Sequence, residues 1–82
     1  MRLKVCVGAA GARAANDDCF EVVGSLAVAR AALSDYIKTT RETAGDTGED
    51  VSGYATALQR ARQAEVGDSI VFGGLRHGIE SA

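Results

Sequence analysis

Two cysteines and one histidine are the residues of this chain with the widest chemical repertoire. Two cysteines can form one disulfide, and a cysteine beside a histidine can act as an activated nucleophile. The spacing of Cys6, Cys19 and His77 matches no metal-ligand or nucleophile motif. A disulfide between the cysteines is geometrically possible, but the pattern favours two unpaired, buried thiols. His77 lies between glycines and is expected to be solvated.

A glycine-rich stretch follows the first apolar segment and could be taken for a phosphate-binding loop. Val5–Val7 followed by Gly8–Gly11 resembles the strand and turn of a dinucleotide site, where glycines let a pyrophosphate approach the backbone. The third glycine of that pattern is missing, and no second strand with an acidic residue follows at the required distance. We therefore expect a hinge of small residues, with nucleotide or anion binding as the alternative.

The acidic residues near the middle of the chain could be taken for a calcium loop. Asp46, Glu49 and Asp50 lack the alternating oxygen ligands over twelve residues that an EF-hand requires. Helix capping explains them better. The sequence thus predicts no catalytic residues, no metal site, no cofactor and no enzyme activity.

The composition predicts one small domain with a light core. Of the 82 residues, 46% are apolar, but many of these are alanine, and there is no tryptophan. Alanine stabilises less by burial than larger side chains do, so a partner is expected to supply the missing burial. The net charge is −2 and there is no run of basic residues, which argues against a nucleic-acid partner. No apolar run is long enough to span a membrane, so no membrane association is expected.

The apolar periodicity predicts an antiparallel helical hairpin, and therefore an all-α fold. Asn16 with Asp17 and Asp18 can start a first helix over 16–44, and Gly45 can end it. A second helix is expected over about 47–66. The predicted partner-binding face comprises Val22, Leu26, Ala29, Leu33 and Tyr36 of the first helix with Tyr54 and Leu58 of the second.

The two ends of the chain are predicted to add little regular structure. Leu3–Val7 alternates in the manner of a short strand or an extended arm. Residues 67–82 are expected to be a flexible or strand-like tail, with a short strand at Ile70–Phe72. If both strands form and pair, the alternative is a small α+β domain with a two-stranded βααβ arrangement.

The layout of the chain resembles the small helical-hairpin proteins of actinobacterial type VII secretion. An opening of Leu3-Lys4-Val5, an alanine-rich first helix and Tyr54 among alanines of the second carry the resemblance. The Trp-x-Gly turn of that family is missing, and Leu58 stands where its secretion signal has an acid. The resemblance implies a helical interaction module that pairs with itself or a similar hairpin, in the cytoplasm or exported without a signal peptide. An antitoxin-like regulatory protein is a further alternative.

Overall fold

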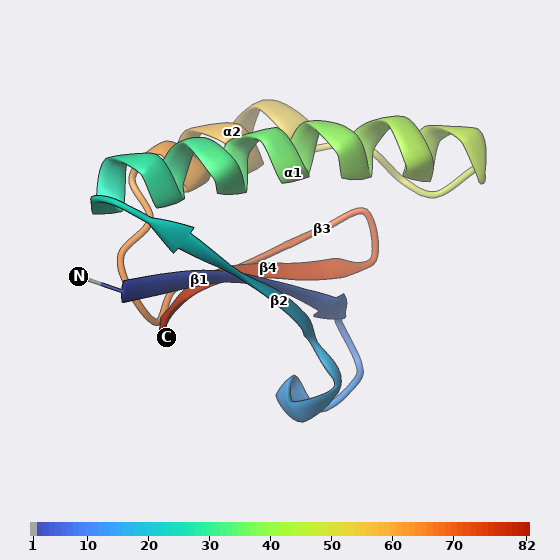
Figure 1. Ribbon diagram of the computed structural model, residues 1–82. Coiled ribbons are helices and arrows are strands. Elements are labelled where there is room, and N and C mark those ends of the chain that lie inside the picture. Colours follow the sequence, from blue (N-terminus) through green and yellow to red (C-terminus); the bar gives the residue numbers. More distant parts are fainter. Residues whose placement is uncertain (1) are drawn as a thin grey trace.

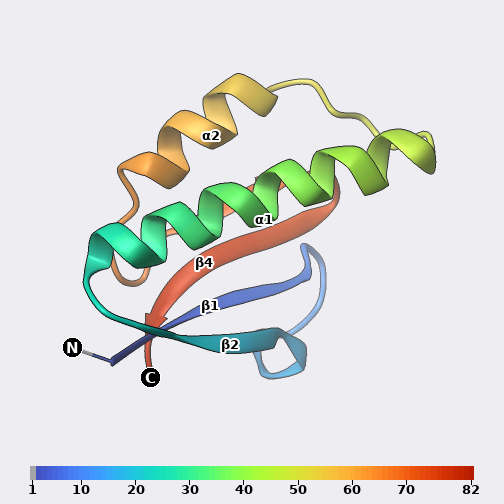
Figure 2. The same ribbon diagram turned by 45° about the horizontal axis from the view of Figure 1, so that its top comes forward.

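The computed structural model describes residues 2–82 and shows a four-stranded antiparallel sheet covered by two helices (Figure 1). The elements are β1 (Arg2–Ala9), the 3-10 turn η1 (Ala14–Asn16), β2 (Asp18–Val23), α1 (Leu26–Asp46), α2 (Tyr54–Arg62), β3 (Ser69–Phe72) and β4 (Leu75–Ser81). The strand order is β2-β1-β4-β3. Both helices lie on one face of the sheet, α1 over the central strands and α2 beside it (Figure 2). Neither α1 nor α2 covers the other face, which we call the open face.

The prediction of an all-α hairpin is therefore wrong, and the largest error lies at the start of the first predicted helix. Residues 18–23 form β2, and α1 begins only at Leu26. Gly24, with φ of +129°, lies between β2 and α1 and separates the strand from the helix. Phe20 and Val22 alternate with Cys19, Glu21 and Val23, so the segment also has the period of a strand.

The first helix ends slightly later than predicted, and the second is shorter at both ends. α1 continues through Gly45, and Gly48 is the residue that takes the left-handed conformation, with φ of +80°. The amide of Glu49 donates to the carbonyl of Ala44 at 2.9 Å, and the amide of Gly48 donates to the carbonyl of Gly45 at 3.3 Å. This is the Schellman arrangement, which satisfies the last free carbonyls of a helix. α2 then spans only Tyr54–Arg62.

The C-terminal segment, predicted to be flexible or strand-like, forms a β-hairpin: the expected strand Ile70–Phe72 lies within β3, whereas β4 was not predicted. β3 and β4 are joined by Gly73 and Gly74, both with positive φ (59° and 78°), as a tight two-residue hairpin turn requires. β4 lies at the centre of the sheet, where Ile79 is fully buried.

The alternative prediction, a two-stranded βααβ arrangement, is also wrong, because the sheet has four strands. Leu3–Val7 and Ile70–Phe72 are both strand residues, but they do not pair with each other. β4 lies between them, and β2 adds a fourth strand.

The core lies between the sheet and the helices. Alternate strand residues point to the helices, so that Leu3, Val5 and Val22 are buried beneath α1. The core cluster comprises Leu3, Val5, Val22, Ala29, Leu33, Ile37, Ala57, Ala61, Ala64, Ile70, Phe72 and Ile79. α1 has 21 residues, but in residues 2–82 neither helix combines such a length with the apolar character that a membrane span needs.

Gly78 is required by a close backbone approach, and this can be tested by substitution. A Cβ built at Gly78 would lie 2.7 Å from the carbonyl oxygen of Asp68, whereas one built at Gly45 meets nothing within 4 Å. We expect Gly78→Ala to lower the free energy of unfolding by about 1–3 kcal/mol through overpacking. Gly45→Ala, inside α1, should raise it by up to about 1 kcal/mol.

The measurement is urea unfolding followed by circular dichroism. Equal stability of Gly78→Ala and the wild type would contradict the close approach.

Candidate functional site

The open face of the sheet carries a disulfide between β1 and the edge strand β2. Cys6 of β1 and Cys19 of β2 are directly opposite each other in the antiparallel register, and their Cα atoms are 4.1 Å apart. Their sulfurs are bonded, so the prediction of two free thiols is wrong. Val5 and Val7, on either side of Cys6, point into the core, and Cys6 therefore points away from the helices.

The two sulfurs differ in their access to solvent. Cys6 is buried, with 3% of its surface exposed, whereas Cys19 lies on the edge strand and is exposed. A reagent in solution can therefore approach Cys19 but not Cys6.

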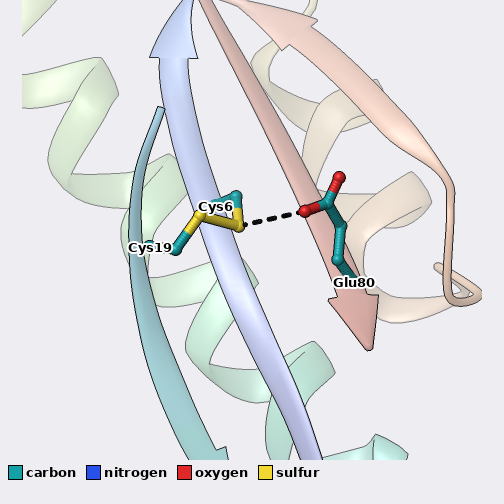
Figure 3. A group of neighbouring side chains, drawn as sticks. All are labelled: Cys6, Cys19 and Glu80. Carbon is teal, nitrogen blue, oxygen red and sulfur yellow. Dashed lines mark hydrogen bonds between the residues drawn. A yellow bond between two sulfur atoms is a disulfide. The ribbon is translucent and has the colours of Figure 1, made fainter. Parts of the chain in front are cut away.

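A carboxylate from β4 lies against the shielded sulfur. Glu80 Oε2 is 3.4 Å from Cys6 Sγ (Figure 3). The same oxygen is 3.9 Å from Lys4 Nζ. The disulfide has no S–H group, so the first contact is between sulfur and oxygen only. In the dithiol form, Cys6 can donate a hydrogen bond to this carboxylate. Lys4 lies between Glu80 and Glu21 in the sheet, and Glu21 has an ion pair with Arg2 at 3.8 Å.

The connection between β1 and β2 covers part of this face. Arg76 Nη2 donates to Asp17 Oδ1 at 2.6 Å, and Arg76 Nη1 donates to the carbonyl of Ala12 at 3.1 Å. Asp17 passes so close to Gly8 that a Cβ there would collide with its carboxylate. A hollow of about 180 Å³ remains beside Cys6 and Glu80. The backbone of Gly78, opposite Cys6, forms part of its wall.

Cys6, Cys19 and Glu80 are a potential ligand group. One atom from each lies within 4.8 Å of the others. A disulfide can exchange with external thiols, and the thiol pair formed on reduction can, together with a carboxylate, bind a thiophilic cation. The two cysteines could be recognised from the sequence as candidate site residues. Glu80 could not, because it belongs to no motif and only the β1–β4 register brings it to Cys6.

His77 is buried on the opposite face, where a solvated residue was expected. Its ring is fully buried; Nδ1 lies 3.2 Å from the carbonyl oxygen of Ile70, and Nε2 lies 2.8 Å from Thr40 Oγ1. A carbonyl only accepts, so Nδ1 carries the proton and Thr40 donates to Nε2. Burial lowers the pKa of His77 below its usual 6.5, against the raising effect of the bond to Ile70. His77 is on the helix-covered face and does not contact the cysteines.

The predicted partner-binding residues pack within the chain itself. Val22, Ala29 and Leu33 are buried, and the other four are half-buried. Tyr36 stacks on Phe20 and meets His77 edge-on, and Tyr54 packs against Phe72. Leu26, Tyr54 and Leu58 pack against the core cluster.

Neither of the other sequence candidates forms the arrangement considered for it. Gly8–Gly11 leads into the single 3-10 turn η1 and then into β2, so it does not open an α-helix as a dinucleotide site requires. Gly53 is the N-cap of α2, so the acids do not cap that helix as predicted, and Asp46 is the last residue of α1. The Asp50 carboxylate accepts the amide of Ser52 at 2.8 Å, and this bond lowers its pKa.

No protein-family model matches this chain, and no similar protein was found among curated proteins or solved structures. The function is therefore inferred from the geometry of the site.

The neutral state of His77 predicts a loss of stability in mild acid. Below about pH 6.5 the unfolded chain takes up a proton that the folded chain does not, so the free energy of unfolding should fall as pH falls from 6.5 towards the lowered pKa. The slope should approach about 1.4 kcal/mol per pH unit. Chemical unfolding at pH 7.5, 6.5, 5.5 and 5.0 measures it.

His77→Gln is the control, because glutamine keeps a donor and an acceptor but does not titrate. The chain has one histidine, so this variant should have a flatter profile whatever its absolute stability. A wild-type profile without a slope over this range would disprove the assignment.

Proposed function

We propose that this protein works as a reversible thiol–disulfide switch through Cys6 and Cys19. The observation that supports it is the position of the pair, with one exposed and one shielded sulfur on the face of the sheet that points away from the core. Exposed disulfides are the ones that exchange readily, whereas structural disulfides are generally inaccessible. The bond can open while the apolar residues between sheet and helices keep their contacts.

Exchange would proceed through the exposed sulfur. A thiolate of an external thiol attacks Cys19 Sγ, the bond between the cysteines breaks, and Cys6 leaves as a thiolate that takes up a proton. A second external thiolate then attacks the sulfur of the external reagent, releasing Cys19 as a thiolate. Two external thiols are oxidised to one disulfide, and the protein gains two electrons and two protons.

Glu80 would influence which form is favoured. A carboxylate 3.4 Å from Cys6 Sγ repels a thiolate there, but accepts a hydrogen bond from a protonated thiol. The dithiol is therefore stabilised in its protonated state after reduction. Lys4 at 3.9 Å from Glu80 moderates the repulsion.

The switch predicts two folded states in equilibrium with glutathione. Reduction removes the constraint on a short loop, so we expect the free energy of unfolding to fall by about 3 kcal/mol while the sheet remains folded. The reduction potential should lie between about −180 and −300 mV. Thiol trapping in glutathione buffers gives the potential, and circular dichroism gives the fold of each state.

Cys6→Ser with Cys19→Ser provides a permanently open reference that should resemble the reduced chain. A structural disulfide gives the opposite outcome: a potential well below −300 mV, or unfolding on reduction and in the double variant. Either result would refute the proposed switch.

Pairing with a second copy is a second candidate function, supported by the edge of the sheet. β2 has strand neighbours on one side only in the described chain, and its Val23 and Phe20 are 91% and 43% exposed. An exposed edge strand with apolar residues can add a strand from another chain. This would make the protein an interaction module through a strand instead of the helical face expected from the sequence.

Self-pairing can be tested by placing a lysine on the edge strand. We expect Val23→Lys to weaken a dimer at least about tenfold, because a charged edge opposes strand addition. Val71→Lys on the other edge strand, where Val71 is 65% exposed, should have no such effect. Sedimentation equilibrium measures the dissociation constant, and a wild-type chain that stays monomeric at about 100 μM rules the pairing out.

A further inference from the structure

We propose that the reduced form of the site binds a zinc ion through Cys6, Cys19 and Glu80. This inference rests on the proposed switch, because the sulfurs can bind a metal only when the disulfide is open. Zinc is bound in proteins by cysteine thiolates and carboxylates, and three protein ligands leave its fourth position for water. The three side chains of this group supply two thiolates and one carboxylate.

One of the distances that a tetrahedral site requires is already present in the oxidised form, whereas the two sulfurs, which are bonded to each other, must separate on reduction. With Zn–S near 2.3 Å and Zn–O near 2.1 Å, the sulfur and oxygen ligands lie about 3.6 Å apart. Cys6 Sγ and Glu80 Oε2 are 3.4 Å apart. Two sulfur ligands lie about 3.8 Å apart in such a site. Cys19 is exposed, so its side chain can rotate to this separation after reduction.

Charge also favours a divalent cation at this position. Two thiolates and a carboxylate together carry three negative charges, which would repel one another without a cation. Zinc neutralises two of them, and Lys4, whose Nζ is 3.9 Å from Glu80 Oε2, offsets the third. The hollow of about 180 Å³ beside Cys6 and Glu80 leaves room for the water.

Oxidation would then release the metal. When glutathione disulfide oxidises the loaded site, the two thiolates lose two electrons and form the Cys6–Cys19 bond, while the glutathione disulfide gains them and gives two glutathione thiolates. The zinc ion leaves without a change of oxidation state. The redox state of the pair thus controls whether the open face of the sheet carries a cation.

The test uses the full chain, reduced under nitrogen and titrated with Zn²⁺ against a chromophoric chelator, and with Co²⁺ as a spectroscopic probe. We expect one ion per chain and the thiolate-to-cobalt charge-transfer band of a tetrahedral site. Glu80→Gln should weaken Zn²⁺ binding at least about tenfold, since even the loss of a group that supports a ligand has an effect of this size. Glu21→Gln is the matched control, because Glu21 flanks Lys4 from the other side but is not a ligand.

Addition of glutathione disulfide to the zinc-loaded chain should release one zinc ion for each disulfide formed. Absence of the charge-transfer band, or equal affinity in Glu80→Gln and Glu21→Gln, would overturn the zinc site. A chain that equilibrates with glutathione but binds no zinc would refute this inference alone. A chain that binds zinc after chemical reduction, but whose disulfide resists glutathione, would refute the switch and leave the metal site standing.

Discussion

The pairing of β1 with β4 is the interaction on which the rest of this structure depends. It joins residues from the two ends of the chain, with Leu3 opposite Ser81 and Val5 opposite Ile79. On one face this register completes the apolar layer under α1. On the other face it sets Glu80 against Cys6. Because side chains alternate along a strand, the same two strands build the core and the site without sharing a residue between them.

The sequence carries enough information for the helical part of the fold. The spacing of Leu26, Ala29, Leu33 and Ile37 indicates a helix with one buried face, and α1 has that face. The strand β2 was missed because Cys19 and Val22 continue the helical spacing backwards by coincidence. Residues 18–23 also alternate in the manner of a strand up to Gly24. This second pattern indicates a strand only if a neighbouring strand is available to pair with it. Local periodicity cannot supply that neighbour.

The site was harder to predict than the fold, for a related reason. Gly73-Gly74 between two apolar residues is a hairpin signal in its own right, and it indicates β3 and β4 without any structure. The meeting of Cys6 with Cys19, however, depends on a strand register set by the β1–β2 connection. The meeting with Glu80 depends on a pairing between residues far apart in the sequence. Composition and motif spacing contain neither register. His77 was misplaced likewise, since its burial follows from the central position of β4.

The difference in sequence separation within the site has a consequence for how the protein matures. The β1–β2 hairpin is local and can form as soon as these two strands leave the ribosome, whereas β4 is synthesised after α1, α2 and β3. During synthesis, the two sulfurs can therefore meet before Glu80 has been made and before α1 and α2 cover the opposite face of the hairpin. The cysteine thiols of the nascent hairpin therefore lack the Glu80 carboxylate that lies beside Cys6 in the folded domain. An oxidant that acts during synthesis meets thiols without this carboxylate, whereas an oxidant that acts on the folded domain meets thiols beside it.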